Sequence, residues 1–349
     1  MGKRVLVTGL GTFWGGRAAK ALELDDDIEM IVGLDTVEPK VELERTEYVR
    51  ADQSYSILAR IVEATQVDTI VHTFLEMDST RMSGRQLHEI NVIGTMNLLA
   101  AAGAPGSSVR HIVVKSSTLV YGANQSDPAW FREEMTRTRP ARTRVERSIL
   151  EVEGYLRDFA DDNPHVVVSL LRFSNVLGTD ITTALSRALE LPLVPSILGF
   201  DPLVQFTEED DVIRSIEFVL RNRIPGIFNV AGDGKIPWSE VASICGKRRL
   251  PMTPFGTGLV ASLLELVRAV DLPPEVLDLL RYGRGVDNRR LQRAGFAYHY
   301  TTAGAVESFV RASRLRRTVG NSRPDYHYER DVENFFRHSP AVVRDGQPE

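Results

Sequence analysis

Short apolar runs alternate with longer amphipathic stretches along the first half of the chain. Runs such as Val5–Val7, Ile112–Val114 and Val166–Val168 contain no polar residue, which is typical of strands buried on both faces of a sheet. The stretches between such runs repeat apolar residues three or four positions apart, as one face of a helix does. Strands are predicted at Arg4–Thr8, Met30–Asp35, Glu47–Arg50, Thr69–Thr73, Val109–Ser116 and Val166–Phe173, and helices at Gly16–Leu24, Ser54–Glu63, Gln86–Ala102 and Arg144–Phe159.

This alternation predicts the α/β fold class, with a doubly wound parallel sheet and helices on both of its faces. After Asn175 the rhythm changes, because prolines become frequent and helical patterns predominate. A smaller, mostly helical lobe is therefore predicted for residues 176–313, with some segments returning to the sheet. Residues 1–175 form the predicted sheet domain, and residues 314–349 form an Arg-rich C-terminal tail.

Composition narrows the choice of partners and compartment. Of 349 residues, 43% are hydrophobic and 26% are charged, and the net charge of −5 lacks the basic excess of nucleic acid-binding proteins. The single cysteine, Cys245, cannot form an internal disulfide and suits a reducing compartment, so a cytoplasmic location is predicted. The most apolar helix-length segment, Gly258–Val270, contains Glu265 and Arg268, so no membrane span is expected.

The first predicted strand runs directly into a glycine-rich turn that opens a helix. Gly9, Gly11 and Gly15 lie in this turn, and such a turn directs backbone N–H groups and the positive helix end at a pyrophosphate. Asp35 ends the second strand, where a carboxylate accepts hydrogen bonds from the adenosine ribose and repels a 2′-phosphate. The pattern predicts a Rossmann-type domain that binds NAD. The alternatives are a turn that serves only helix packing, and an Arg17 that favours a 2′-phosphate.

Further motifs follow in a fixed order and resemble those of one family. The chain is similar to the extended short-chain dehydrogenase/reductases, the nucleotide-sugar epimerases and dehydratases typified by UDP-glucose 4-epimerase, over about residues 1–313. The matching segments are Thr8–Gly15, Asp35, Arg50–Asp52, Val67–His72, Asn91–Thr95, Ser116–Gly122 and Leu171–Val176, with weaker likeness at Val204–Val212, Gly226–Val230 and Asp287–Phe296.

The resemblance implies a role for particular residues. Asp52 would reach the adenine amino group, Ser117 would orient the substrate hydroxyl, and Asn175 would bind the diphosphate of a nucleotide sugar. Asn91 and Asn175 could instead cap helices, and Ser117 could satisfy backbone groups at a strand end. The full set implied to contact the cofactor is Gly9, Gly11, Thr12, Phe13, Trp14, Gly15, Asp35, Asp52, Gln53, Phe74, Leu75, Asn91, Ser116 and Phe173, with Ser116 and Phe173 near the nicotinamide.

The chain departs from the family pattern in the glycine turn and at the catalytic pair. Thr12 stands where the family has its middle glycine, so the turn is expected to differ locally. Alignment on Glu153 puts Val145 and Ile149 at the positions of the family's catalytic Tyr and Lys. In such enzymes the Lys lowers the pKa of the phenol, which then exchanges a proton with the substrate hydroxyl. Neither Val nor Ile can do this.

Substitutes for the missing groups are few. Tyr121, Tyr155, His72 and His88 are alternative proton carriers, although each residue type at such positions is more often structural. The family's phosphate-binding Arg would fall on Val204, and Arg284 is a candidate phosphate ligand instead. A run of arginines could also bind phosphate or form a solvated face: Arg137, Arg139, Arg142, Arg144 and Arg147.

Two functional hypotheses remain. One is an NAD-dependent enzyme of the epimerase/dehydratase type that acts on a nucleotide sugar or a related alcohol, without a metal and with a non-standard proton carrier. The other is a catalytically inactive NAD(H)-binding sensor or scaffold protein. The resemblance also implies a homodimer, joined through the helices Gln86–Ala102 and Arg144–Phe159.

Overall fold

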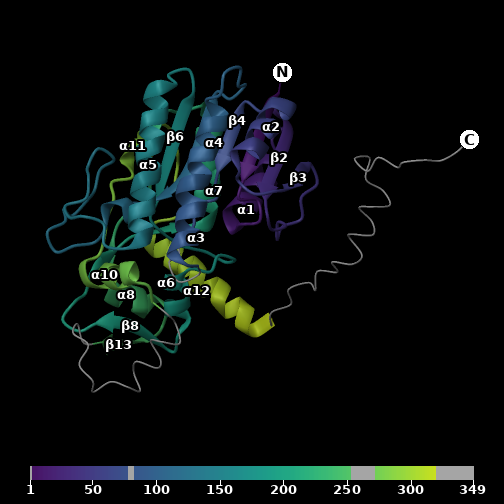
Figure 1. The fold of residues 1–349 in the computed structure, drawn as a ribbon. Coiled ribbons are helices and arrows are strands. Elements are labelled where there is room, and N and C mark those ends of the chain that lie inside the picture. Colours follow the sequence, from purple (N-terminus) through teal and green to yellow (C-terminus); the bar gives the residue numbers. More distant parts are fainter. Residues whose placement is uncertain (1, 78–81, 253–271, 320–349) are drawn as a thin grey trace, which may run out of the picture. The chain divides into compact units, whose positions relative to one another are not determined.

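A seven-stranded parallel sheet forms the centre of the protein (Figure 1). The structure, a computed structural model, describes residues 2–77, 82–252 and 272–319. In spatial order the strands are β11 (Gly226–Val230), β6 (Val167–Phe173), β5 (His111–Ser117), β4 (Thr69–His72), β1 (Lys3–Thr8), β2 (Ile28–Asp35) and β3 (Thr46–Arg50). The predicted parallel sheet is confirmed, and its first six strands begin and end within two residues of the predicted positions.

The strand order reverses between β1 and β4, as in doubly wound nucleotide-binding sheets, where ligands bind beyond the carboxyl ends of the strands. Helices cover both faces of the sheet (Figure 1). One face packs on α1 (Phe13–Leu22) and α7 (Glu209–Asn222). The other packs on α2 (Tyr55–Thr65), α4 (Gly94–Ala102) and α5 (Arg144–Asp162). The central residues of the inner strands, such as Val5–Val7 of β1 and Ile112–Val114 of β5, are apolar and buried because neither face of the sheet meets water there.

The helix predicted at Gln86–Ala102 contains an irregular turn. It consists of α3 (Gly84–His88), a π-helical turn (Glu89–Ile93) and α4, without a break between them. Ser83 starts it with a capping box, in which its side chain accepts from the Gln86 N–H and Gln86 reaches back to Ser83. Such π-turns, which insert one extra residue into a helix, are common at functional sites. This one contains Asn91.

The chain after β6 builds a second apolar core and also returns to the main sheet. β7 (Asn175–Leu177) pairs with β10 (Phe206–Glu208), β8 (Leu193–Ile197) with β13 (Arg248–Met252), and β9 (Leu203–Val204) with β12 (Ile236–Pro237). The buried Trp238 and Phe206 lie in this core. The helices are α6 (Ala184–Glu190), α8 (Trp238–Ile244), α10 (Pro274–Tyr282), α11 (Arg289–Arg293) and α12 (Thr302–Val319). Two later segments lie at the main sheet: β11 pairs with β6, and α7 packs on one face.

The chain divides into two compact units, residues 1–312 and 313–349. The boundary predicted after residue 175 falls within the first unit, at the start of β7. The apolar segment 258–270 lies outside the described residues, as does the predicted Arg-rich tail from residue 320 onward. In the part of the chain that the structure describes, no helix is both long enough and apolar enough to cross a membrane.

Candidate functional site

The glycine turn after β1 brings the first turn of α1 against the end of that strand. Gly9 has a φ of +78°, which a residue with a Cβ rarely adopts. A Cβ at Gly15 would lie 2.0 Å from the Gly9 carbonyl oxygen, so only glycine permits this approach. The N-terminus of α1 therefore opens at the carboxyl edge of the sheet, where it can receive an anion.

Thr12 caps the helix that this turn begins. Its hydroxyl accepts a hydrogen bond from the Gly15 N–H at 3.1 Å and donates one to the Gly9 carbonyl at 2.6 Å. The local difference expected at Thr12 is thus a side-chain cap that uses one of the free N–H groups of the first turn. Phe13 and Trp14 follow, with their rings edge to face at a centroid distance of 4.8 Å.

Asp35 is buried at the end of β2 and faces the turn. One carboxylate oxygen accepts from the Gly11 N–H at 2.9 Å and the other from the Val37 N–H at 3.1 Å. A carboxylate has about four lone-pair sites, so these bonds leave capacity for ribose hydroxyls. A Cβ at Gly11 would lie 2.4 Å from the Val37 carbonyl oxygen, which explains the glycine there.

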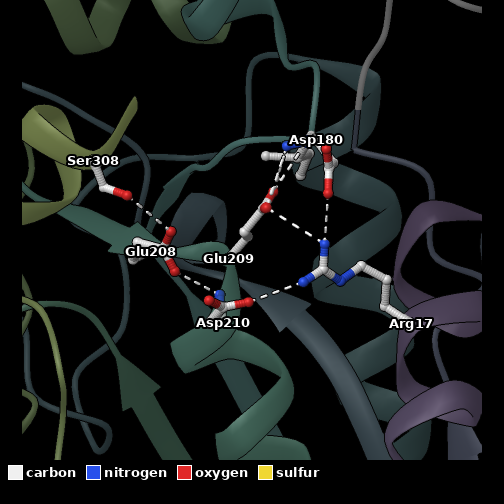
Figure 2. A network of polar contacts seen from close by, with 7 residues as sticks. Arg17, Asp180, Glu208, Glu209, Asp210 and Ser308 are labelled. Carbon is white, nitrogen blue, oxygen red and sulfur yellow. Dashed lines mark hydrogen bonds and ion pairs between the residues drawn. The ribbon is translucent and has the colours of Figure 1, made fainter. Parts of the chain in front are cut away.

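Arg17 does not serve the adenosine side of the turn. Figure 2 shows its guanidinium extended toward the start of α7, where it pairs with Asp180 at 2.9 Å, Asp210 at 2.9 Å and Glu209 at 3.4 Å. These three carboxylates hold the charge that a 2′-phosphate would require. The alternative role expected for Arg17, at a 2′-phosphate, therefore competes with three ion pairs.

The residues implied for the adenine subsite follow β3. Asp52 is exposed and accepts from the Ser54 N–H at 3.0 Å. Gln53 lies against helix α4: a Cβ at Gly94 would approach the Gln53 Oε1 to 2.2 Å, and Asn97 donates to the Gln53 carbonyl at 2.9 Å. The glycine of the Asn91–Thr95 motif therefore admits the Gln53 side chain.

The segment after β4 lies directly on the glycine turn. A Cβ at Gly9 would be 3.0 Å from the Phe74 Cα, and Leu75 is buried beside it. Asn91 holds this segment in place, since its amide bonds the Glu76 N–H at 2.8 Å and the Glu76 carbonyl at 2.9 Å, and also the Ser148 hydroxyl at 3.2 Å. Asn91, expected at the cofactor, thus has its polar atoms engaged in positioning the loop.

The two serines at the end of β5 point to opposite faces of the sheet, as successive strand residues do. Ser116, expected near the nicotinamide, donates to Glu153 of α5 at 2.6 Å. Glu153 also pairs with Arg172 of β6, and all three side chains are buried. Ser117 is half-buried, pairs in register with Phe173, and accepts from the Leu119 N–H at 3.2 Å.

Tyr121 belongs to the same buried network as Arg172. Its hydroxyl accepts from Arg172 at 2.7 Å and donates to Asn229 at 2.8 Å, and its ring stacks on Phe131. Burial raises the pKa of the Tyr121 phenol above its ordinary value. The hydroxyl also lies 3.3 Å from the Arg132 carbonyl, so its proton is shared between two acceptors inside the protein.

The positions of the family's catalytic pair are filled by packing. Val145 and Ile149 are both 0% exposed and lie in one apolar cluster with Val120, Tyr121 and Phe131. Both side chains point from α5 into this cluster. The structure thus shows no space kept open at either position.

The remaining candidates for proton transfer are placed differently. Both ring nitrogens of the buried His72 are engaged, with the hydroxyls of Thr8 at 2.7 Å and Thr95 at 2.9 Å. Burial lowers the pKa of His72 to about 3, so it is neutral at physiological pH. The side chains of His88 and Tyr155 are 54% and 39% exposed, on the outer surface of the helices.

One buried charged residue was overlooked by the sequence interpretation. Lys115 of β5 is 7% exposed, and its ammonium donates to the Leu75 carbonyl at 3.2 Å and lies 5.9 Å from the centre of the Trp14 ring. Burial lowers its pKa to about 8. The signal that could have found it is a lysine inside the apolar run that starts at Ile112, in a strand covered on both faces.

The candidate substrate ligands lie beyond the sheet edge. Asn175 is half-buried in β7 and donates to the Gln205 carbonyl at 3.3 Å. Arg284 is buried and donates to the Gly122 carbonyl at 3.1 Å, and burial lowers its pKa to about 10. Val204 is 0% exposed in the second core, so that position offers no phosphate ligand.

The arginine run before α5 does not form one patch. Arg137 pairs with the buried Glu146 at 3.1 Å, whereas Arg142 reaches Asp278 at 3.8 Å. Arg142, Arg144 and Arg147 are among the residues that line a hollow of about 520 Å³ facing α10. Among the described residues, no group of three or more His, Cys, Asp or Glu side chains is placed to hold a metal ion.

Comparison with known proteins identifies the family that the chain matches. A model of the NAD dependent epimerase/dehydratase family matches residues 5–231. An uncharacterised protein of Mycobacterium bovis is 33% identical over 319 residues, which cover 90% of this chain and 85% of that protein.

Solved structures of similar fold were also found. UDP-glucuronic acid 4-epimerase from Bacillus cereus, in complex with NAD, superposes with a TM-score of 0.68 at 16% identity, covering 89% of this chain and 99% of its own. dTDP-glucose 4,6-dehydratase from Bacillus anthracis, also in complex with NAD, gives a TM-score of 0.67 at 17% identity, covering 90% and 98% respectively.

Proposed function

The chain belongs to the NAD-dependent epimerase/dehydratase family, and on this premise we propose that it oxidises a hydroxyl of a nucleotide sugar or a related alcohol with NAD. The observation that supports the proposal is the arrangement at the carboxyl edge of the sheet. The glycine turn, the buried Asp35 and the half-buried Ser117 all lie along this edge.

The residues present fit NAD. The N-terminus of α1 and the turn before it offer N–H groups to a diphosphate, and Asp35 has lone pairs for the ribose hydroxyls. Because Asp180, Glu209 and Asp210 hold Arg17, this arginine is not available to compensate a 2′-phosphate beside Asp35. Bound NAD supplies the acceptor for a hydride from the substrate carbon.

The protein's own part in the reaction is to hold the alcohol and to take its proton. Ser117 accepts its bond from the Leu119 N–H, so its O–H remains a donor toward the substrate oxygen. Loss of hydride from carbon and of the proton from oxygen leaves a ketone. The proton carrier is a group other than the Tyr/Lys pair, because Val145 and Ile149 hold no proton to exchange.

A second candidate function is supported by one observation. Val145 and Ile149 are fully buried in an apolar cluster, as expected of a site that selection no longer keeps open for catalysis. A catalytically inactive protein that binds NAD(H) as a sensor or scaffold would have this packing together with the intact turn. Positioned proton transfer contributes about 10²–10⁴-fold, so its loss slows hydride transfer without abolishing it.

A single-turnover reaction distinguishes the two functions. Wild-type protein in excess, mixed with NAD and a panel of nucleotide sugars, is expected to form NADH with at least one sugar. NADP in place of NAD should give little signal, because Asp35 repels the 2′-phosphate. Absorbance and mass spectrometry of the product follow the reaction. NAD binding without NADH formation from any sugar favours the sensor, and reduction of NADP in preference to NAD contradicts the role of Asp35.

We also propose that the protein is a homodimer through the helices α3–α4 and α5. Leu98 and Leu99 of α4 are buried within the chain and contribute nothing to this surface. The apolar side chains that remain exposed on these helices are Ile93 (42%), Met96 (39%), Leu150 (36%) and Tyr155 (39%). Met96 and Tyr155 line a shallow hollow between α4 and α5. Packed against a second copy, these helices would form a four-helix bundle.

Sedimentation velocity tests this assembly. The wild type is expected to sediment as a dimer, and Met96→Glu with Tyr155→Glu should convert it to a monomer, because charges would replace the apolar centre of the interface. Leu24→Glu is the matched control, since Leu24 is an exposed leucine (82%) outside these helices. A wild type that stays at 39.0 kDa at every concentration contradicts the dimer.

A further inference from the structure

Lys115 is a buried charge for which the proposed function has so far no use. Burying an ammonium group is costly unless it is well paired. A lysine ammonium has three N–H donors, and among the described residues only the Leu75 carbonyl accepts a hydrogen bond from it, at 3.2 Å. The face of the Trp14 ring adds a weak attraction at 5.9 Å. Two N–H groups are therefore available to a further acceptor.

The position of Lys115 identifies where that acceptor lies. Side chains alternate along β5, so Lys115 shares a face with Ser117, whereas Ser116 faces Glu153. Its contacts are the segment after β4, through Leu75, and the first turn of α1, through Trp14. These two segments border the point where the strand order reverses, at which doubly wound sheets bind their ligands.

The charges around Lys115 leave it as the local cation. His72 of β4 is close enough for the charge of Lys115 to lower its pKa, and it is neutral at physiological pH. Glu76, after β4, is the acidic group that favours the protonated lysine. From α1, the neighbour is the uncharged Trp14. On the far face of β5, Glu153 is paired with Arg172.

We propose that Lys115 is a cofactor ligand whose ammonium donates to oxygens on the nicotinamide half of bound NAD, either the diphosphate or the second ribose. It supplies from β5 the cation that Ile149 cannot supply from α5. This inference rests on the NAD site of the proposed function. It adds a contact from strand β5, on the face of the sheet opposite to helix α5, where the family has its Tyr/Lys pair.

Calorimetry tests the assignment by comparing how tightly wild type and Lys115→Met bind NAD and smaller parts of the dinucleotide. Removal of a charge-assisted hydrogen bond is expected to weaken NAD binding by roughly tenfold to a hundredfold. AMP, which carries only the adenosine end held by Asp35, should bind wild type and variant equally. Equal loss for ADP and NAD assigns the diphosphate, and loss only for ADP-ribose and NAD assigns the ribose. Lys20→Met, a change at a partly exposed lysine of α1, is the control with unchanged affinity.

The wild type alone provides a second test, which needs no folded variant. The protonated ammonium binds the anionic cofactor, so NAD affinity should fall as the pH rises through about 8 and beyond, the range in which Lys115 loses its proton. AMP affinity should stay constant over the same range. Where Lys115→Met folds, as judged by thermal unfolding, its NAD affinity should no longer change with pH in this range.

The outcomes separate this inference from the proposed function. If the variant binds NAD as tightly as the wild type, or if AMP weakens as much as NAD, Lys115 is not a cofactor ligand while the NAD site stands. A pH-independent NAD affinity in the wild type has the same meaning. If the wild type binds no NAD at all, both the inference and the proposed function are wrong.

Discussion

Restoring the family's catalytic pair, by Val145→Tyr with Ile149→Lys, is expected to unfold or strongly destabilise the protein instead of creating an efficient enzyme. Both positions are 0% exposed and packed among Val120, Tyr121 and Phe131. Inserting a phenol there overpacks the cluster, which costs about 1–3 kcal/mol. A lysine among apolar side chains adds several kcal/mol for a buried, unpaired charge. The sum is comparable to the whole stability of a typical domain, about 5–15 kcal/mol.

Urea unfolding of the double variant beside the wild type measures this loss. Ile149→Val is the matched control, because it removes one methylene from the same cluster and should cost only about 0.5–1.5 kcal/mol. The single-turnover reaction with NAD and nucleotide sugars is run on the same samples. A double variant that is as stable as the wild type and forms NADH faster would contradict the packing argument, and would show that the site still opens toward the nicotinamide.

Glu153→Gln is expected to lower the free energy of unfolding by about 3–5 kcal/mol, because it leaves Arg172 as an uncompensated buried charge. The two side chains are 3% and 7% exposed. Glu153 also accepts from Ser116 at 2.6 Å, and Arg172 donates to Tyr121 at 2.7 Å. One carboxylate thus supports the end of β5, the start of the following turn and β6 together.

A double-mutant cycle with Arg172→Met separates the pair from the rest of the network. Removing both charges should recover part of the loss, because no unpaired ion is left behind. The exposed pair of Arg85 and Glu89, with side chains 88% and 55% exposed, supplies the control: Glu89→Gln should change stability by less than about 0.5 kcal/mol. Equal losses of unfolding free energy for Glu153→Gln and Glu89→Gln would mean that the buried pair stabilises the protein no more than the exposed pair does.

The sequence by itself was sufficient for the main sheet and its cofactor edge. The middle of a strand covered on both faces is mostly apolar, so the runs Val5–Val7 and Ile112–Val114 can be recognised as strands from their own residues. The turn from Gly9 to Gly15 is equally local, because the backbone conformation and close approach that it needs lie within a few residues. The fold class, the NAD frame and the family followed from such local patterns.

The tertiary structure decided which groups the polar side chains near this edge contact. Ser116 contacts helix α5 and Lys115 lies beside helix α1, and the sequence of β5 alone does not determine which helix covers each of its faces. Asn91 could be assigned to the loop after β4 only once a π-turn and α5 had been placed around it. The ammonium of Lys115 is buried, and the space at Val145 is filled, by residues from elements far apart in the chain. The physical reason is that hydrogen bonds and charges are satisfied by whichever groups the fold brings within about 3 Å, and that choice is made only when distant segments meet.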